Sequence, residues 1–471
     1  MALLDHRGPV RLRVSAGETE SQAGPAVRQA LTTINDARSL RAVEREDGHV
    51  SNIFDELQWR GLVAQTTDEA ALREALEGKL TVYCGFDPTA PSLHFGNLVQ
   101  LMQLRRLQQA GHRVICLVGG STGLIGDPKP DSERVLRTKD QVADAVASIR
   151  AQAESFLDFD GDNPATMVNN LDWTEGISAL DFLRDYGKYF RVNAMIKKDA
   201  VSARLNSDTG ISYTEFSYQI LQGLDYLHLY RAHGCTLQVG GSDQWGNLIA
   251  GVDLVRLADS AHVHALTSPL LTDSTGRKYG KSEGNAIWLN PEMTSPYAFY
   301  QYFVNVEDSE VVKLLKVFSD LGPEEIAEYE RQVADEPFKR AAQRALASAA
   351  TTLVHGADAT EAVQAASEAL FGKGDITALD ARTLRDATTE LPGGEVAVGT
   401  GIVEALIAVG IADSRNAARR LIGDGGISVN NDKITDVEAS LNENDFLHGQ
   451  VAVIKRGRKH QAAARLPQNS A

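Results

Sequence analysis

The feature that most constrains the fold is an alternation of short apolar runs with helical patterns between residue 80 and about residue 270. Strands that alternate with amphipathic helices are typical of a parallel sheet that is covered by helices. In such a sheet, ligands bind at the carboxyl ends of the strands. We therefore predict an α/β fold with a parallel sheet, whose strands include the runs LTVYCGF, HRVICLVGG, ATMVNN and TLQVGGSD.

The segments on either side of this alternation have a different character. Residues 1–49 carry few aromatic residues, mixed charges and no sustained period, so we expect a disordered leader. Apolar residues at helical spacing begin after a cap at Ser51 or Asn52, and Val50, directly before them, is the expected natural start. From residue 296 to about residue 370 the pattern is almost wholly helical, as in KRAAQRALASAATTLVHG.

The last hundred residues contain a linker-like segment and a small compact unit. Residues 372–400 are rich in glycine, threonine and aspartate, a composition typical of linkers. Two short helical patterns follow, and then the runs GGISVNND and VAVIKRGRKH. The expected parts are a leader (1–49), an α/β domain (50–295), a helical domain (296–371), a linker (372–400) and a small α+β domain (401–466).

Composition excludes several classes of protein. A formal net charge of −16 argues against a protein that coats nucleic acid non-specifically, because such binding needs many lysines and arginines. The three cysteines Cys84, Cys116 and Cys235 are too few and too scattered for a disulfide framework or a metal site. The chain has no signal pattern and no apolar run long enough to cross a bilayer. We expect a cytoplasmic protein with no membrane segment and no bound metal.

The stretch TVYCGFDPTAPSLHFGNLVQL, residues 81–101, starts as a strand, breaks at two prolines and ends as a helix. Free backbone N–H groups and a partial positive charge at a helix N-terminus suit phosphate. Thr89 and His94 would add side-chain donors. A polar loop with a capping threonine explains the same residues, and this stretch alone does not decide between the two interpretations.

Two glycine-rich segments strengthen the phosphate interpretation. VGGSTGLIGDPKPDSER, residues 118–134, follows a strand and ends in Arg134, and its glycines allow close approach of backbone to a ligand. GRKYGKSEGN, residues 276–285, carries Lys278 and Lys281, which in a mobile loop could close over a polyphosphate. Taken singly, the second segment is better explained as a surface loop with solvated lysines.

Polar residues on a helix and after a strand complete the set. Tyr218, Gln222 and Asp225 lie on one face of the helix predicted over 213–230. Buried polar groups cost free energy unless they are paired, so these side chains either pair together or line a polar pocket. LQVGGSDQWGN, residues 237–247, presents Asp243 and Gln244 after a strand, where they suit ribose hydroxyls or an amino-acid head group.

These five blocks, in their order along the chain, together resemble the bacterial tyrosyl-tRNA synthetases, a family of class I aminoacyl-tRNA synthetases. The resemblance covers about residues 51–466. It implies a Rossmann-like catalytic domain that activates L-tyrosine with ATP to tyrosyl-adenylate, releases pyrophosphate and transfers tyrosine to the 3′ end of tRNA(Tyr). It also implies a homodimer, Mg²⁺ as the ATP complex and no tightly bound cofactor.

The resemblance assigns a role to individual residues. Around the leaving pyrophosphate it places the catalytic residues Thr89, His94, Arg134, Lys278 and Lys281. For tyrosine it implies Tyr83 and Asp225 on the phenol, with Asp127, Tyr218, Gln222 and Gln244 around the ammonium and carboxylate groups. For ATP it implies Cys84, Gly85, Asp87, Gly96, Asn97, Gly241, Asp243 and Lys281.

The sequence departs from the family pattern in two places. Asn97 stands where the family motif has a second histidine, although asparagine can still donate a hydrogen bond. After Asp127 the usual serine-glycine-lysine-lysine run is replaced by Lys129-Pro130-Asp131. We therefore assign the family's contact with pyrophosphate to Arg134 rather than to Lys129.

The final unit, with SRNAARRLIGDGGISVNNDKI at 414–434, resembles an S4-type RNA-binding domain. Basic patches on an acidic protein fit that interpretation, while a solvated basic helix face is the alternative. The resemblance implies tRNA contacts by Arg415, Arg419, Arg420, Lys455 and Arg456. Rival interpretations of the whole chain are a tryptophan-charging synthetase, a nucleotidyltransferase and a non-catalytic RNA-binding protein.

Overall fold

The computed structural model describes residues 52–129, 132–208, 210–272, 281–282, 285–372, 374–457 and 460–467, without the side chains of 281–285. The expected leader at 1–49 and the predicted catalytic residue Lys278 lie outside the described residues. Lys281 belongs to the short strand β7 (Lys281–Ser282), but only its backbone is described.

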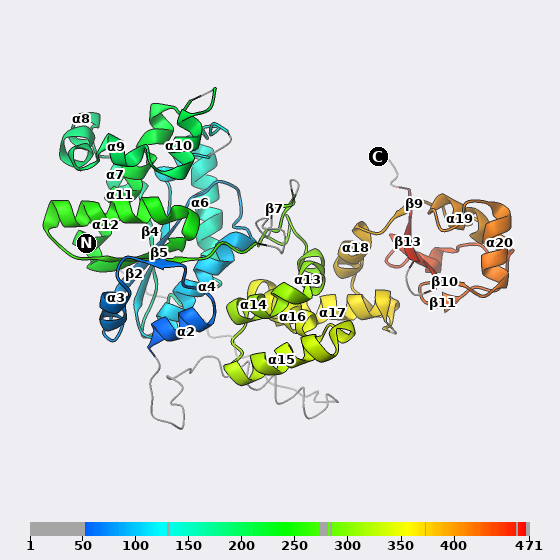
Figure 1. Ribbon diagram of the computed structural model, residues 1–471. Coiled ribbons are helices and arrows are strands. Elements are labelled where there is room, and N and C mark those ends of the chain that lie inside the picture. Colours follow the sequence, from blue (N-terminus) through cyan, green and yellow to red (C-terminus); the bar gives the residue numbers. More distant parts are fainter. Residues whose placement is uncertain are drawn as a thin grey trace, which may run out of the picture. The chain divides into compact units, whose positions relative to one another are not determined.

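A mixed, mostly parallel sheet forms the centre of the first domain (Figure 1). All of its strand pairs are parallel except β1–β6, so the predicted parallel α/β fold is confirmed. The order across the sheet is β1 (Gln65–Thr66), β6 (His264–Ser268), β5 (Cys235–Gly241), β2 (Thr81–Phe86), β3 (Arg113–Val118) and β4 (Thr166–Asn169).

Helices cover both faces of this sheet because the strand residues are apolar on both sides. On β2, Val82 and Cys84 belong to the core shared with α4 (Phe95–Gln109) and α6 (Lys139–Ala153). Tyr83, between them, belongs to the core of the opposite face, beneath α11 (Tyr213–His233) and α12 (Trp245–Asp259). Alternate side chains of a strand point to opposite faces, so a strand buried on both sides is a continuous apolar run.

The carboxyl ends of β2, β3 and β5 all lead into short loops and then into helices. β3 passes through Gly119 to α5 (Thr122–Ile125), and a Cβ at Gly119 would lie 2.1 Å from Asp87 Oδ1. Only glycine therefore allows the loops after β2 and β3 to approach each other this closely. The smaller helices of the domain are α2 (Ile53–Trp59), α3 (Glu69–Ala75), α7 (Leu171–Thr174), α8 (Ala179–Asp181), α9 (Val192–Met195) and α10 (Asp199–Leu205).

A helical region follows and shares the core of the sheet. The ring of Phe95 on α4 lies 5.2 Å from that of Phe303 and 4.9 Å from that of Phe318. Arg60 and Arg106 both donate hydrogen bonds to the carbonyl of Ser319, at 3.1 and 2.7 Å. The helices are α13 (Pro296–Val304), α14 (Asp308–Phe318), α15 (Pro323–Asp335), α16 (Ala341–His355), α17 (Ala357–Phe371) and α18 (Ala381–Thr389).

The structure differs from the expected linker at residues 372–400. This segment contains α18 and the strand β9 (Gly393–Glu395), which pairs in parallel with β13 (His460–Arg465). A Cβ at Gly393 would lie 2.0 Å from the carbonyl oxygen of Ala463. Gly393, one of the glycines that suggested a linker, is therefore needed for close packing of a strand.

The small C-terminal domain contains two helices and a five-stranded sheet, in the order β11-β10-β12-β13-β9. Its own apolar core includes Leu406, Ile422 and Ile454. The elements not yet given are α19 (Ile402–Ala408), α20 (Arg415–Gly423), β10 (Ile427–Val429), β11 (Asp432–Lys433) and β12 (Val451–Arg456).

Candidate active site

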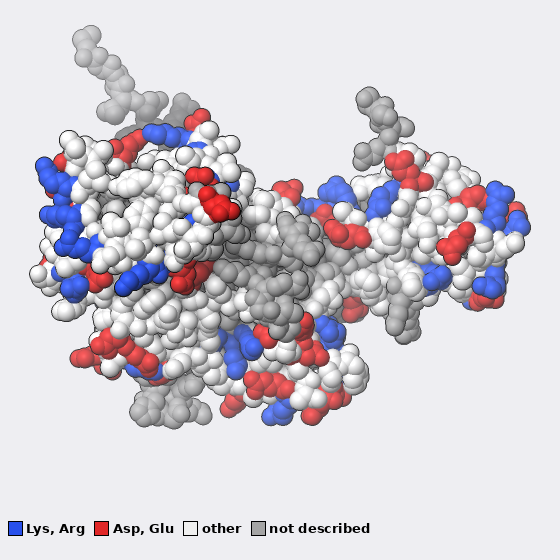
Figure 2. Space-filling view, turned by 45° about the horizontal axis from the view of Figure 1, so that its top comes forward, with Lys and Arg blue, Asp and Glu red and all other residues white. Residues whose placement is uncertain are grey.

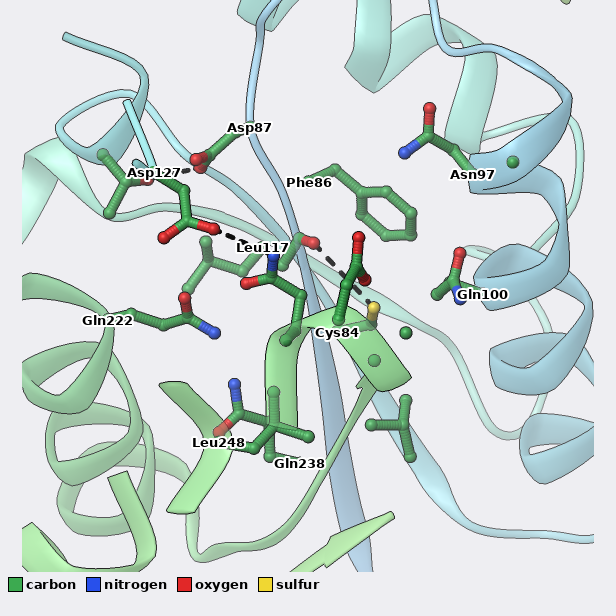
Figure 3. Close-up of a pocket in the computed structure, with 18 of the residues that line it drawn as sticks. Cys84, Phe86, Asp87, Asn97, Gln100, Leu117, Asp127, Gln222, Gln238 and Leu248 are labelled. Carbon is green, nitrogen blue, oxygen red and sulfur yellow. Dashed lines mark hydrogen bonds between the residues drawn. The ribbon is translucent and has the colours of Figure 1, made fainter. Parts of the chain in front are cut away.

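A cavity of about 260 Å³ opens at the carboxyl ends of β2, β3 and β5. In Figure 3, Asp87, Asp127 and Gln222 lie on one side of β2, and Asn97 and Gln100 of α4 lie on the other. The lining includes every residue predicted to bind tyrosine: Tyr83, Asp127, Tyr218, Gln222, Asp225 and Gln244. It also includes Cys84, Gly85, Asp87, Gly96, Asn97, Gly241 and Asp243 of the predicted ATP set, and Thr89, His94 and Arg134 of the predicted catalytic set.

Asp225 is a buried carboxylate at one end of this cavity. Its Oδ2 accepts a hydrogen bond from Asn170 Nδ2 at 2.9 Å, and its Oδ1 accepts one from Trp173 Nε1 at 3.0 Å. Burial raises the pKa of Asp225 to about 8, although both hydrogen bonds act in the opposite direction. The carboxyl group is thus held in one orientation and titrates close to neutral pH.

Three buried polar atoms that line the cavity have no hydrogen-bond partner among the described residues: Tyr83 Oη, Gln222 Oε1 and Gln238 Oε1. The Tyr83 side chain packs edge-on against Tyr226, with ring centroids 5.2 Å apart. Its pKa is raised well above the ordinary value, first by burial and then by the charge of Asp225. Unpaired buried polar groups are costly, so a cavity lined by them is suited to a ligand with matching polar groups.

Asp87 lies at the centre of a second hydrogen-bonded group. Its two oxygens accept from Tyr218 Oη and Thr122 Oγ1, both at 2.6 Å. Burial raises the pKa of Asp87, and these two hydrogen bonds oppose the rise. Thr122 Oγ1 also accepts from Asn170 Nδ2 at 3.0 Å, which connects Asp87 to Asp225 through two neutral side chains. Tyr218, predicted for the substrate ammonium, is hydrogen-bonded to Asp87.

Asp127 is held by three side chains from beyond its own loop. Its Oδ1 accepts from Lys198 Nζ at 2.8 Å and from Asn247 Nδ2 at 3.2 Å. Its Oδ2 accepts from Gln244 Nε2 at 3.0 Å. Asp127 and Gln244, both predicted to bind tyrosine, are thus adjacent to each other.

His94 and Asn97 form the start of α4 at the other end of the cavity. His94 is the N-cap, and its Nδ1 accepts from the backbone N–H of Gly96 at 3.0 Å. Asn97 Oδ1 accepts from the backbone N–H of His94 at 3.1 Å, which completes a capping box. A Cβ at Gly96 would lie 2.8 Å from the His94 ring, so glycine is required there. Asparagine at position 97 therefore has a structural role in the cap.

Sequence reasoning missed several residues of the site. Thr122 and Gln238 line the cavity, and Asn170, Trp173 and Lys198 hold its carboxylates. The pair Asn169-Asn170, at the carboxyl end of β4, was a usable signal, because it lies at the same sheet edge as the other loops. Lys198 belongs to a basic run of the sequence that suggested RNA contact, whereas the structure places it on Asp127, which is distant in the chain.

The basic residues predicted to bind tRNA divide into two groups. Arg415, Arg419 and Arg420 are exposed on α20, where Figure 2 shows basic side chains on the surface of the C-terminal domain. Arg415 also forms an ion pair with Glu404 at 3.2 Å. Arg456 is partly buried, and its Nη1 lies 3.4 Å from the carbonyl oxygen of Ile411.

Lys455 requires a correction. Its side chain is buried, and its Nζ donates to the carbonyls of Ala369 and Leu370 at 2.8 and 2.7 Å. Burial also lowers the pKa of this ammonium group. Lys455 therefore caps the C-terminal end of α17 in this structure, and its ammonium is not available for RNA.

Comparisons with known proteins agree with this geometry. Residues 75–372, more than half of the chain, match the family described as tRNA synthetases class I (W and Y). Residues 383–463 match the tyrosine–tRNA ligase SYY-like C-terminal domain.

Similar proteins and one similar solved structure are described as tyrosine-charging enzymes. The tyrosine–tRNA ligase of Streptomyces avermitilis is 59% identical over 88% of this chain and 99% of its own length. That of Leifsonia xyli subsp. xyli is 57% identical over 90% of this chain and 96% of its own. A C-terminally truncated mitochondrial tyrosyl-tRNA synthetase of Aspergillus nidulans superposes with a TM-score of 0.62 at 32% identity, covering 68% of this chain and 94% of the other. The chain belongs to the tyrosine–tRNA ligases, within the class I tRNA synthetases.

Proposed function

We propose that this tyrosine–tRNA ligase forms tyrosyl-adenylate in the cavity at the carboxyl ends of β2, β3 and β5. The tyrosine carboxylate attacks the α-phosphorus of ATP, a new C–O–P link forms, and pyrophosphate leaves with the bonding electrons. Because the attacking carboxylate is already ionised, the protein need not remove a proton from it. The protein's contribution is to position the reactants and to stabilise charge on the phosphates.

The phenol of tyrosine is proposed to bind between Tyr83 and Asp225. The observation that carries this proposal is the unpaired, buried Tyr83 Oη beside a carboxylate that is fixed by Asn170 and Trp173. Tyr83 would donate to the phenol oxygen, and the phenol would donate to Asp225. Phenylalanine would fill the same space but leave both groups unpaired, which penalises its binding.

The amino-acid head group is proposed to lie between Asp127 and Gln222. Gln222 Oε1 is an unpaired acceptor, and Asp127 supplies a carboxylate for the ammonium. Tyr218 reaches this region while bonded to Asp87. Gln244, bonded to Asp127, would lie close to the substrate carboxylate.

The phosphates of ATP are proposed to lie at the N-terminus of α4. The partial positive charge of this helix N-terminus, with Thr89, His94 and Arg134, would bind the leaving pyrophosphate. Lys278 and Lys281 are assigned to the same role by the family motif alone. Cys84, Asn97, Gly241 and Asp243 would hold the nucleotide, chiefly its ribose, and Gly85, Asp87 and Gly96 border the same space.

Magnesium is proposed to arrive as part of the ATP complex. Among the described residues there is no group of three or more histidine, cysteine or acidic side chains that could hold a metal ion. Mg²⁺ is commonly bound through substrate phosphates and water, so phosphate oxygens would supply its ligands here.

The tRNA is proposed to contact the C-terminal domain through Arg415, Arg419 and Arg420, which are exposed on α20. The helical region before it would meet the anticodon. Arg419→Ala with Arg420→Ala is expected to raise the KM for tRNA(Tyr) in aminoacylation and to leave ATP–pyrophosphate exchange unchanged. A loss of exchange in this variant would contradict the assignment.

A homodimer is proposed on the basis of an exposed apolar surface in the catalytic domain. Leu180, Val192 and Tyr213 are 78%, 61% and 66% exposed, and Leu183 and Leu205 lie in the same segment of chain. A contiguous exposed apolar patch commonly marks a protein–protein interface, and these side chains are proposed to form one. Val192→Glu is expected to shift the sedimentation coefficient towards that of a monomer, and an unchanged value would remove Val192 from the interface.

The location is proposed to be the cytoplasm, where a bacterial ligase meets its tRNA. Across the described residues, every helix falls short of the length or apolar character that a bilayer span requires.

ATP–pyrophosphate exchange with tyrosine, tryptophan and phenylalanine tests the proposal. We expect exchange with tyrosine and almost none with the other two amino acids. Exchange with tryptophan alone would overturn the assignment of Tyr83 and Asp225, and no exchange with any of the three would overturn the catalytic role of the cavity.

A further inference from the structure

A buried ion pair lies next to the phosphate end of the cavity, and no role assigned above uses it. Arg204 on α10 and Glu215 in the first turn of α11 are bonded by Nη2–Oε2 at 3.2 Å and Nη1–Oε1 at 3.3 Å. Both side chains are 2% exposed. Arg204 is the largest fully buried side chain among the residues that the structure describes.

Two polar atoms of this pair also bind the loop that carries Arg134. Arg204 Nη1 donates to the carbonyl of Ser132 at 2.6 Å. Glu215 Oε1 accepts from the backbone N–H of Arg134 at 3.2 Å. Both members of the pair therefore contact the short stretch 132–134.

Arg134 is held from its other side as well. Its Nε donates to the carbonyl of Asp127 at 2.6 Å, and its aliphatic stem packs against Gly126. Gly126 has a φ of +82°, and a Cβ there would lie 3.1 Å from Arg134 Cγ. Arg134 thus has its backbone fixed by Glu215 and its side chain fixed at the start of the loop.

Stability alone is a weak reason for such a pair. Removing two charges from water is costly, and replacing a buried ion pair with apolar residues is often neutral or stabilising. A fully bonded ionic pair does, however, fix the geometry of the groups around it. Here those groups are the backbone of the loop that presents Arg134 to the cavity.

We propose that Arg204 and Glu215 are positioning residues that hold Arg134 in place for contact with pyrophosphate. The proposal rests on the proposed role of Arg134. Neither residue touches the substrates, and each acts through the backbone of residues 132–134.

The test compares Glu215→Gln, Arg204→Lys and Arg134→Ala with the wild-type protein. The KM for pyrophosphate is measured in ATP–pyrophosphate exchange, and tyrosine affinity is measured by equilibrium dialysis. Arg231→Lys is the matched control, because Arg231 also pairs from α11, with Asp259 at 2.6 Å, but on the surface.

Both Glu215→Gln and Arg204→Lys are expected to raise the KM for pyrophosphate by about five- to tenfold, as displacement of a charge-assisted contact does. Tyrosine affinity should stay within about twofold, because the phenol and ammonium contacts are untouched. The control should match the wild type in both measurements. The Glu215→Gln/Arg134→Ala double variant should be no worse than Arg134→Ala alone, because Glu215 acts through Arg134.

Three outcomes would overturn the proposal in distinguishable ways. A wild-type pyrophosphate KM in Arg134→Ala removes the role of Arg134 itself. An effect in Arg134→Ala with none in Glu215→Gln and Arg204→Lys removes the positioning role alone. Additive effects in the double variant, or a fall in melting temperature with equal losses of tyrosine and pyrophosphate binding, would show that the pair only stabilises the fold.

Discussion

The two ends of the cavity are built in different ways. At the phenol end, Asp225 is fixed by hydrogen bonds from Asn170 and Trp173. Tyr83 Oη is buried there without a hydrogen-bond partner among the described residues. At the phosphate end lie the N-terminus of α4, with His94 as its cap, and Arg134, whose backbone N–H is hydrogen-bonded to Glu215. The first end is a rigid pocket fitted to one side chain, and the second is a surface suited to charge.

This difference assigns separate tasks to the two ends. Contacts that are equally strong before and during the reaction set affinity and specificity, whereas contacts that strengthen in the transition state set the rate. The phenol lies far from the reacting atoms, so its contacts should act on binding. The charge on the leaving pyrophosphate grows during the reaction, so His94 and Arg134 should act on the rate.

The largest effect is expected at the phosphate end. His94→Asn should lower the rate of adenylate formation by about 10² to 10³-fold, the range for loss of one preorganised donor. Asparagine is a good N-cap, so α4 should keep its start. Rapid-quench measurement of adenylate formation checks this, and a rate within threefold of wild type would contradict the assigned role.

A somewhat smaller effect is expected at the phenol end. Asp225→Asn should lower kcat/KM for tyrosine by about 10- to 100-fold, because a hydrogen bond to a charged group contributes roughly 1.5–3 kcal/mol. The new amide would also place a donor against the Asn170 or Trp173 donor. The activity with phenylalanine should change little, and an equal loss with both amino acids would show general damage to the site.

The raised pKa of Asp225 predicts how tyrosine binding depends on pH. The carboxyl group is protonated in the empty site below its pKa of about 8, whereas acceptance of the phenol proton requires the ionised form. Binding then releases a proton below pH 8, so the tyrosine Kd should rise by up to about tenfold per unit as pH falls and level off above pH 8. Equilibrium dialysis between pH 6 and 9 measures this, and the dependence should be absent in Asp225→Asn.

The smallest effect concerns Tyr83. Tyr83→Phe should reduce discrimination between tyrosine and phenylalanine by about three- to tenfold, the value of one neutral hydrogen bond. Because the hydroxyl is buried and unpaired without a ligand, its removal should leave the melting temperature of the free protein unchanged or higher. A clear fall in melting temperature would mean that Tyr83 Oη has a structural partner.

Local sequence patterns predicted the elements that carry the cavity. The strand of residues 81–86, the glycine turn at Gly119 and the face of α11 that bears Tyr218 and Asp225 all have short-range signals. The parallel fold followed from these patterns, because buried strands and amphipathic helices have different periods.

The parts of the fold and of the predicted sites that the sequence did not predict depend on tertiary contacts. Gly393 suggested a linker, but its missing side chain makes room for the backbone of β13. Lys455 belonged to a basic cluster in sequence, but it is buried against carbonyls at the end of α17. In both cases the deciding partner lies far away in the chain, where composition and spacing carry no signal.

The central claim is that one end of the cavity selects tyrosine and the other accelerates the reaction. The most direct test is to measure, on Asp225→Asn and on His94→Asn, both the tyrosine Kd and the single-turnover rate of adenylate formation at saturating tyrosine. We expect a weaker Kd with a nearly normal rate for Asp225→Asn, and a normal Kd with a much slower rate for His94→Asn. Similar losses of affinity and rate in both variants would contradict the central claim.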